Sequence, residues 1–439
     1  MRETRGHRVS PALASRRNSA AVEMRRFDIA IAGCGPAGLA TALLLHREGH
    51  SVTLFDRFDA PRPVGSGLMI QPTGLAVLRR LGLADALLEH GARVDRLYGE
   101  AGSSGRVVLD VRYSALGRSA GFGVGVHRAT LFALLHDAVR SEGIAIETGC
   151  AVAASELLAD GRRRLLLEDG RGVGPFDLVV DALGTRTPLA PDCGRELAYG
   201  ALWGTLDWPA GSGFDPAALA QRYRRASVMV GVLPIGHLPD GARRQAAFFW
   251  SLRADRLGEW HAAGLNAWKA DVADLWPATR PLLDQISTPD QLTFARYAHR
   301  TLRAPAEPGM IHIGDAWHSA SPQLGQGANM ALLDAYALAL ALREVEDVPS
   351  ALTRAVAMRR RHVRLYQALT ALFTPVYQSD SHLLPFARDR LVGPLSRLWP
   401  ITRIQASMVS GLIGNPLARL DLLPPMANAT GHSAPIVAS

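Results

Sequence analysis

The feature that most constrains this chain is the glycine pattern Gly-Cys-Gly-Pro-Ala-Gly at residues 33–38. A short apolar run at residues 27–32 precedes it and predicts a β-strand. Residues 36–48 follow with leucines on one face, which predicts a helix. A second strand is expected at residues 51–55, ending at Asp56. The segment therefore predicts a βαβ unit of the dinucleotide-binding kind.

Each position in this unit has a chemical reason. Gly33 makes the tight turn, Gly35 lets the backbone approach a pyrophosphate, and Gly38 lets the helix pack closely on the strand. The free N–H groups of the helix N-terminus face the phosphates. Asp56 accepts hydrogen bonds from a ribose 2′-hydroxyl and repels a 2′-phosphate. The predicted contacts of the first motif are Gly33, Gly35, Pro36, Ala37, Gly38 and Asp56.

A second glycine-rich segment lies almost three hundred residues further along the chain. A strand is expected at residues 310–313, and Gly314 ends it so that Asp315 presents a carboxylate at the edge of the sheet where ligands bind. A loop with Pro322 then leads to a glycine-lined helix start, which suits an electron-rich ring that becomes anionic on reduction. The predicted contacts of the second motif are Gly314, Asp315, Pro322, Gly325, Gly327, Ala328 and Asn329.

Together, the two motifs resemble those of the single-component FAD monooxygenases, the aromatic hydroxylases of the para-hydroxybenzoate hydroxylase type. The resemblance covers roughly residues 24–375. It implies that the first motif holds the ADP half of FAD and the second holds the ribityl chain and the flavin. It also implies that Arg128 lies beside the ribityl chain, that residues 65–67 pass over the flavin, and that His318 supports Asp315 from behind. A solvated arginine at a helix start is the alternative for Arg128.

One family element differs in this chain. The family carries a strand ending in Ala-Asp-Gly, linked to FAD and NAD(P)H contacts, and here the corresponding residues are Ala182, Leu183 and Gly184. A leucine cannot replace the hydrogen bonds of a carboxylate. Asp181 lies two positions earlier on the same strand face and is a candidate substitute. NAD(P)H is still the expected electron donor.

The predicted fold class is α/β, with a Rossmann-like FAD-binding domain formed by residues 24–186 and 295–375. A β-rich substrate domain is expected as an insertion at residues 187–294, with strands at 221–233 and 245–251. Residues 1–23 are expected to be a disordered tail, and residues 376–439 a helical region. The aromatic candidates for an apolar pocket over the flavin are Trp203, Trp208, Phe248, Phe249 and Trp250.

Composition excludes several classes of protein. The 439 residues carry a formal charge of +8, almost wholly from arginine, without the basic and aromatic clusters expected of a nucleic-acid binder. No apolar stretch is long enough to predict a membrane span. Three scattered cysteines give no metal site and favour a reducing cytoplasm. The C-terminal region is expected to cap the core, with a cover over the active site or a peripheral membrane contact as alternatives.

The predicted function is an FAD-dependent monooxygenase that hydroxylates or epoxidises an apolar or aromatic small molecule. In the family, reduced flavin and O₂ give a C4a-hydroperoxide that transfers one oxygen atom, so no catalytic side chain is predicted. A flavin-dependent dehydrogenase or reductase of a lipid or isoprenoid is the alternative. A halogenase is less favoured, because Lys269 is its sole lysine candidate and the Trp-x-Trp-x-Ile-Pro signature is absent.

Overall fold

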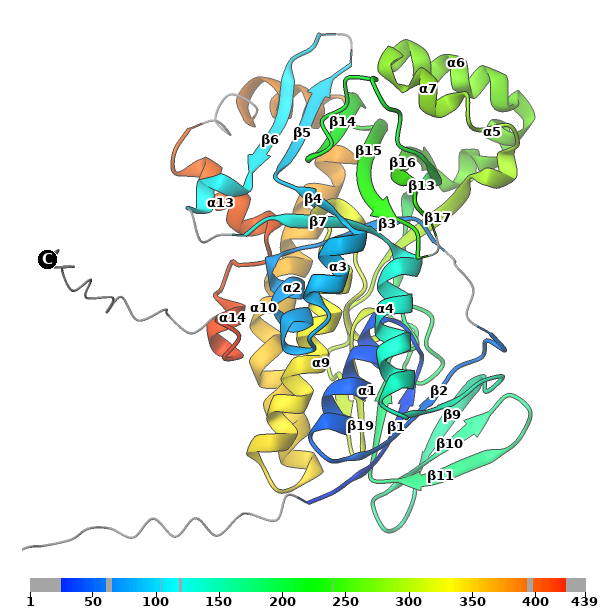
Figure 1. Cartoon of the computed structure of the whole chain (residues 1–439), viewed down its shortest axis with the longest axis vertical. Helices are drawn as coiled ribbons and strands as arrows, with labels where there is room; N and C mark the ends of the chain where they lie inside the picture. Colours follow the sequence, from blue (N-terminus) through cyan, green and yellow to red (C-terminus); the bar gives the residue numbers. More distant parts are fainter. Residues whose placement is uncertain are drawn as a thin grey trace, which may run out of the picture.

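A computed structural model describes residues 25–60, 65–102, 104–117, 121–239, 241–392 and 398–423 of the chain. The tail predicted at residues 1–23 lies outside the described residues. The described chain forms two lobes, with a parallel sheet in the lower one and a large antiparallel sheet in the upper one (Figure 1). The predicted α/β class is therefore confirmed.

The lower lobe is built on a six-stranded sheet in the order β18-β19-β12-β1-β2-β8. Its neighbours are parallel except for β18 and β19. The predicted βαβ unit is present as β1, helix α1 (Pro36–Arg47) and β2. The strands of this sheet are β1 (Asp28–Ala32), β2 (Ser51–Phe55), β8 (Ala145–Glu147), β12 (Leu178–Asp181), β18 (Ala306–Glu307) and β19 (Met310–His312).

The two faces of this sheet are covered differently. Ile29 and Ile31 of β1 point to a layer of helices, whereas Ala30 and Ala32 point to a small three-stranded sheet, as the alternation of a strand requires. The small sheet consists of β9 (Val152–Leu157), β10 (Arg163–Leu167) and β11 (Gly172–Phe176). The helices are α1, α2 (Pro72–Arg80), α3 (Ala84–His90), α4 (Arg128–Ser141), α8 (Asp315–His318), α9 (Gly327–Glu344) and α10 (Val348–Tyr377).

Helix α9 is the central element of the helical layer. It packs on α1, α2 and α10, and its residues from Asn329 to Leu342 are all buried. A helix that is enclosed on every side must be apolar all round, which the run of alanine and leucine provides. Asp334 is the one acidic residue within that buried stretch.

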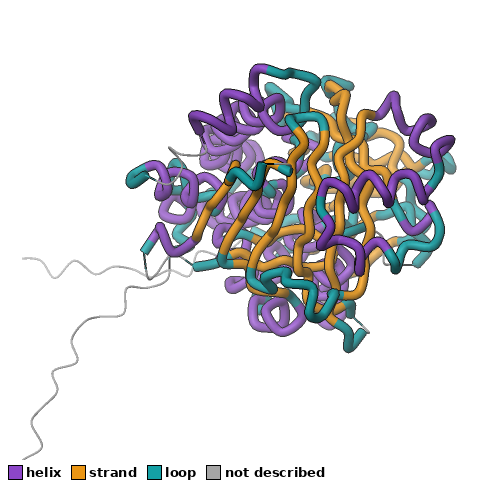
Figure 2. The backbone as a smooth tube through the Cα atoms, turned by 90° about the horizontal axis from the view of Figure 1, so that it is seen from above, coloured by secondary structure: helices purple, strands orange, loops and turns teal. Residues whose placement is uncertain are grey.

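The upper lobe contains a seven-stranded sheet in the order β17-β13-β16-β15-β14-β5-β6. Seen from above, its strands run side by side with helices against them (Figure 2). Leu202, Phe248 and Trp250 on one face pack against α5 (Leu257–Ala263), α6 (Leu265–Leu275) and α7 (Arg280–Leu283). The strands are β5 (Arg96–Ala101), β6 (Val107–Arg112), β13 (Arg195–Asp207), β14 (Ala218–Arg224), β15 (Val228–His237), β16 (Arg244–Arg253) and β17 (Thr293–His299).

The upper lobe differs from the expectation in two respects. The run at residues 221–233 is a hairpin of β14 and β15, turning at Arg225, whose φ is 58°. The sheet also includes β5 and β6, which lie far upstream of the expected insertion at residues 187–294. β5 pairs with β14 in parallel, so this edge depends on contacts between distant parts of the chain.

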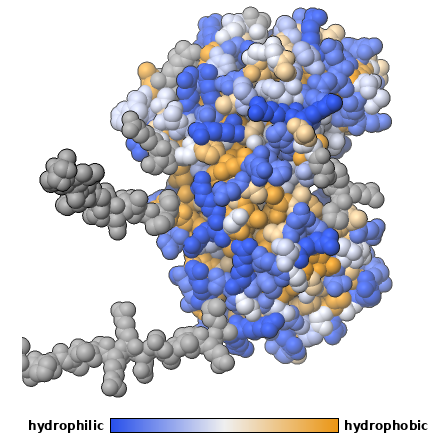
Figure 3. Space-filling view, viewed as in Figure 1, coloured by the Kyte–Doolittle hydropathy of each residue, from blue (hydrophilic) through white to orange (hydrophobic). Residues whose placement is uncertain are grey.

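A second small sheet joins the lobes. It consists of β3 (Gly67–Ile70), β7 (Gly123–His127) and β4 (Ala92–Val94). Met69 of β3 packs with Leu233, Ile235 and Ala247 of the upper sheet. In Figure 3, apolar side chains gather around this junction of the two lobes.

The C-terminal segment returns to the core. Ala406 and Val409 of α13 (Ile401–Val409) pack beside Met69 and Tyr113. Leu417 of α14 (Pro416–Arg419) joins the main core of the lower lobe. These contacts form a cap, whereas α11 (Leu383–Ala387) carries exposed apolar side chains. No helix within the described ranges is both long and apolar enough to cross a membrane.

Candidate functional site

The first glycine motif forms a turn directly after β1. Gly33 has a φ of 104°, and a Cβ there would lie 2.6 Å from the carbonyl oxygen of Ala182. A Cβ at Gly38 would lie 1.9 Å from the carbonyl oxygen of Gly33. Both positions therefore require glycine for the protein's own packing.

Gly35 is different from the other two glycines. It precedes α1, and a Cβ built on it meets no atom within 4 Å. Its backbone adopts ordinary angles, with φ −71° and ψ 176°, so conformational strain does not explain the glycine. Pro36 beside it is half-buried, and Ala37 and Gly38 are buried in the helix. The open space in front of a helix N-terminus fits a pyrophosphate group that approaches the backbone closely.

Asp56 lies at the carboxyl end of β2, next to this turn. Its Oδ2 accepts a hydrogen bond of 2.6 Å from the backbone N–H of Cys34. Its Oδ1 has only a long contact of 3.4 Å from the N–H of Phe58, which leaves acceptor capacity for a ribose hydroxyl. Burial, aided by the nearby Asp56 charge, raises the pKa of the Cys34 thiol. Cys34 is therefore a protonated packing residue of the turn.

The second motif follows β19. Gly314 has a φ of 56°, and its N–H donates to Asp334 Oδ2 at 3.0 Å. Asp315 is exposed, although Ala316, Trp317 and His318 after it are buried. The protein atoms around the Asp315 carboxylate desolvate it and so raise its pKa, whereas the charges of His318 and Arg128 act in the opposite direction. An exposed carboxylate at the carboxyl edge of a parallel sheet is placed to accept hydrogen bonds from a ligand.

The start of α9 faces Asp315. Gly327 is exposed, and a Cβ on it would lie 3.9 Å from Asp315 Oδ1. Pro322 is also exposed and Ala328 is half-buried, so this helix N-terminus is open beside the carboxylate. Gly325 ends the preceding turn in the left-handed conformation, with φ 60°. These residues leave room for a group that combines hydroxyls with an electron-rich ring.

Arg128 lies at the start of α4 and is exposed. Its charge acts on Asp315, and its N–H donates to the carbonyl of Ser66 at 3.0 Å. A Cβ on Gly65 would lie 2.8 Å from Arg128 Cδ, so the loop at residues 65–67 runs against this side chain. The structure thus brings Arg128, the loop and Asp315 together.

Asn329, a predicted cofactor contact, has its side chain engaged within the protein. Its side chain is fully buried, and Oδ1 accepts from the N–H of Gln71 at 2.7 Å. Its Nδ2 donates to the carbonyls of Met69 and Gly325 at 3.0 and 2.9 Å. All of these partners are backbone groups of the protein. The Asn329 side chain therefore joins α9 to the end of β3, and its contact with the cofactor stays a prediction.

A buried network of charged side chains holds the segment that carries Asp315 in place. Asp334 Oδ2 lies 2.5 Å from His318 Nε2, and Asp334 Oδ1 accepts from Arg359 Nε at 2.8 Å. Burial alone would raise the pKa of Asp334, but the His318 and Arg359 contacts outweigh it and lower the pKa to about 2. His318 is thus a supporting residue, as the resemblance implied. Sequence reasoning missed Asp334. The signal that could have revealed it is a single carboxylate within an otherwise apolar helix.

Asp181 does not replace the missing family carboxylate beside Leu183. It is fully buried and accepts from the N–H of Leu183 at 3.0 Å and from Thr187 Oγ1 at 2.8 Å. His312 Nδ1 lies 2.6 Å from Asp181 Oδ2, the oxygen that also accepts from Thr187. With three internal partners it holds the end of β12, and Leu183 packs half-buried against the cluster beneath.

The predicted aromatic residues divide between the two faces of the upper sheet. Phe248 and Trp250 pack against Trp268 on α6, and Trp208 also contacts that cluster. These three are therefore core residues. Trp203 and Phe249 lie on the opposite face, with ring centroids 4.7 Å apart.

Trp203, which packs against the cluster around Met69 of β3, forms a wall with Tyr297 on that face of the upper sheet. The indole N–H of Trp203 donates to Tyr297 Oη at 2.9 Å, and both side chains are partly exposed. His127, next to Arg128, lies 3.2 Å from Thr205 on the same strand as Trp203. Burial raises the pKa of Tyr297, opposed by its hydrogen bond from Trp203 and by the charge of Arg128. Sequence reasoning did not single out Tyr297.

Comparison with known families agrees with this geometry. The family described as FAD binding domain matches residues 26–172 and 269–368, more than half of the chain. The chain belongs to this family. The family's match includes both glycine motifs, and the residues around Gly35 and Asp315 offer the open backbone and carboxylate that FAD requires.

Similar proteins are monooxygenases. The 6-hydroxynicotinate 3-monooxygenase of Pseudomonas fluorescens is 26% identical over 351 residues, covering 72% of this chain and 83% of its own. The aurachin C monooxygenase/isomerase of Stigmatella aurantiaca is 26% identical, covering 84% and 94%. Klebsiella pneumoniae HpxO, solved with FAD and uric acid, shares the fold with a TM-score of 0.75 and 19% identity, covering 89% and 98%. The chain is an FAD-dependent monooxygenase, not a dehydrogenase or a halogenase.

Proposed function

We propose that this flavoenzyme oxygenates a small aromatic compound at the wall formed by Trp203 and Tyr297, with NAD(P)H as the electron donor. The observation that carries the proposal is the position of this pair, which is hydrogen-bonded internally and lies within range of the Arg128 charge. The relatives named for 6-hydroxynicotinate and aurachin C, and the neighbour solved with uric acid, support a ring-shaped substrate.

The protein groups divide the work of holding FAD. The backbone around Gly35 would hold the pyrophosphate, Asp56 would accept from the ribose, and Asp315 with the start of α9 would hold the ribityl hydroxyls and the flavin. When bound, FAD supplies the activation of O₂ and the transfer of one oxygen atom. The side chains around it bind the substrate and exclude water.

Tyr297 positions the substrate. Its Oη already accepts a hydrogen bond from Trp203, so its own proton is free to be donated to an oxygen or nitrogen of the substrate. Its raised pKa keeps that proton in place at neutral pH. Tyr297 is therefore a donor and not a general base, and the indole of Trp203 provides the flat apolar surface beside it.

Two finer expectations belong to this proposal. A cytoplasmic location is supported by Cys193, which is exposed and carries a free thiol.

A peripheral membrane contact is supported by the exposure of Leu383 at 74%, Phe386 at 53% and Trp399 at 77%. Arg390 beside them would face anionic headgroups. Co-sedimentation with anionic vesicles tests this contact, and equal recovery of protein with and without vesicles would contradict it.

The main proposal is tested with the purified yellow protein. NADH and NADPH oxidation is measured with a panel of hydroxylated and nitrogen-containing aromatic compounds under ¹⁸O₂. The expected result is substrate-stimulated oxidation with one ¹⁸O atom in the product. Products that carry no ¹⁸O, formed with stoichiometric loss of hydrogen, would refute the oxygenation of an aromatic ring.

A further inference from the structure

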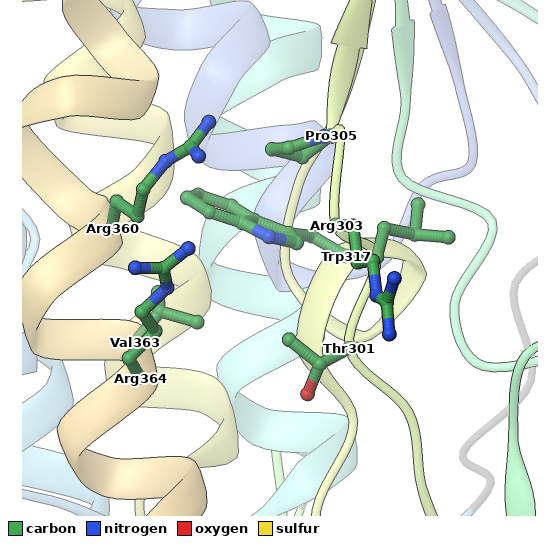
Figure 4. Close-up of a pocket in the computed structure, with 8 residues that line it drawn as sticks. Thr301, Arg303, Pro305, Trp317, Arg360, Val363 and Arg364 are labelled. Atoms are coloured by element: carbon green, nitrogen blue, oxygen red, sulfur yellow. The ribbon is translucent and has the colours of Figure 1, made fainter.

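A small pocket lies between α10 and the segment at residues 301–305 (Figure 4). Its volume is about 90 Å³. Arg360, Val363 and Arg364 of α10 line one side, and Thr301, Leu302, Arg303 and Pro305 line the other, with Trp317 between them. The N–H of Leu302 donates to the carbonyl of Trp317 at 2.9 Å, so the segment at residues 301–305 and Trp317 form one unit.

Three arginines line the pocket, and of these Arg303 and Arg364 are exposed and Arg360 is partly exposed. Within the described part of the chain, Arg303, Arg360 and Arg364 form no ion pair and no side-chain hydrogen bond, although other arginines pair with acids in many places. Helix α10 has no aspartate or glutamate in its 30 residues. The segment at residues 300–305 has none either. Neither of these two segments therefore supplies an acid that would offset the mutual repulsion of the arginines.

The neighbouring Arg359 shows that the arrangement is not a property of the helix alone. Its guanidinium is buried and pairs with Asp334 on α9. Arg360, one position later, instead projects with Arg364 toward the Trp317 indole (Figure 4). The sequence Arg359-Arg360 therefore places one cation in the core network and the next in the pocket.

The size and chemistry of the pocket select a class of ligand. A volume of about 90 Å³ corresponds to roughly three water molecules, which is the size of one tetrahedral oxyanion. Guanidinium groups bind phosphate oxygens through paired, charge-assisted hydrogen bonds. The hydroxyl of Thr301 adds a further donor. A group with two negative charges would offset the repulsion between Arg360 and Arg364, which lie on the α10 side of Trp317, whereas the Arg303 guanidinium lies on its other side (Figure 4).

We propose that the pocket of Arg303, Arg360 and Arg364 beside Trp317 binds a phosphate group. Two sources share this chemistry, namely free inorganic phosphate and the 2′-phosphate of a nicotinamide dinucleotide. Trp317 belongs to α8, between Asp315 and His318, so the bound phosphate contacts the same short helix that presents the flavin-side carboxylate. The site does not depend on the proposed aromatic substrate.

The test uses the FAD-loaded full chain and inorganic phosphate, with binding followed by isothermal calorimetry and by Trp fluorescence. We compare the wild type with Arg360→Gln and Arg364→Gln. Arg361→Gln is the matched control, since Arg361 is exposed on the same helix but does not line the pocket. Each pocket substitution should weaken phosphate binding about tenfold, and the control should leave it unchanged.

The source of the phosphate is separated in a second arm. If NADP⁺ displaces phosphate and the pocket variants raise KM for NADPH but not for NADH, the 2′-phosphate is the ligand. If NADP⁺ does not compete, free phosphate is the ligand. Absence of saturable phosphate binding to the wild type, or equal loss in Arg361→Gln, would overturn the proposal. Since binding is measured without turnover, failure of the monooxygenase assay does not affect this result.

Discussion

Replacement of Gly35 by alanine should separate cofactor binding from folding. The new Cβ would enter the open space before α1, where no protein atom lies within 4 Å, and the backbone angles there suit alanine. Alanine restricts the unfolded chain, which stabilises by about 0.4–1 kcal/mol, and it is a poorer N-cap than glycine by a similar amount. The two effects offset each other, so the stability of the FAD-free protein should change by less than about 1 kcal/mol.

The effect of Gly35→Ala on FAD should be much larger. Placing a methyl group where a pyrophosphate must touch the backbone is a case of overpacking, which typically costs about 1–3 kcal/mol. The expected dissociation constant for FAD is therefore about 5- to 150-fold higher. Flavin fluorescence on titrating the FAD-free protein measures this constant, and thermal unfolding of the same sample measures stability.

Gly38→Ala is the matched control. Its Cβ would lie 1.9 Å from the carbonyl oxygen of Gly33, so it should destabilise the FAD-free protein itself. The reasoning fails if Gly35→Ala keeps wild-type affinity for FAD. It also fails if that variant loses stability as Gly38→Ala does, because the space before α1 would then be needed for folding.

Four further outcomes are expected. Asp315→Ala removes charge-assisted hydrogen bonds of about 1.5–3 kcal/mol each and should weaken FAD retention about tenfold or more, as read by flavin release on gel filtration. Tyr297→Phe should lower kcat/KM for the aromatic substrate by about 3- to 10-fold at unchanged FAD content, and an unchanged value would remove Tyr297 from the substrate wall. Because Leu183 offers no carboxylate and Asp181 is engaged internally, anaerobic reduction by NAD(P)H without substrate should be slow in stopped-flow measurements. Burial and the Arg359 charge lower the pKa of His362 to about 3, so the unfolded chain binds its proton first. Stability should therefore fall as the pH drops from about 6.5 toward 3, and His362→Gln should flatten that part of the urea-unfolding profile.

The parts of the site that the sequence predicted are those built from neighbouring residues. The turn at Gly33, the helix start after Gly35 and the acid after β2 depend on a few consecutive positions whose backbone needs are visible in the residue types. The same holds for Gly314 and Asp315 after β19. Their placement follows once the strands are parallel, since parallel strands end at the same edge of a sheet.

The parts that the sequence could not predict depend on distant partners. Asn329 is engaged by Gln71, 258 positions away, and Asp181 by His312, 131 positions away. Phe248, Phe249 and Trp250 are consecutive, so strand alternation puts Phe249 on the opposite face from the other two. Which face meets the cofactor is decided by the pairing of β13, β16 and β17, and no local pattern specifies that pairing.

The position of the second motif depends on a buried network around Asp334 as well as on the motif's own glycines. Asp334 accepts from the N–H of Gly314, from Arg359 on α10 and from His318 on α8, so one carboxylate fixes the start of the Asp315 loop against two helices. Arg359 in turn contacts His362, whose ring reaches the carbonyl of Gly411 in the C-terminal segment. Removing one partner of such a network leaves a buried charge unpaired, which typically costs 3–5 kcal/mol. The C-terminal segment is thereby connected, through His362, Arg359 and Asp334, to the turn that precedes Asp315.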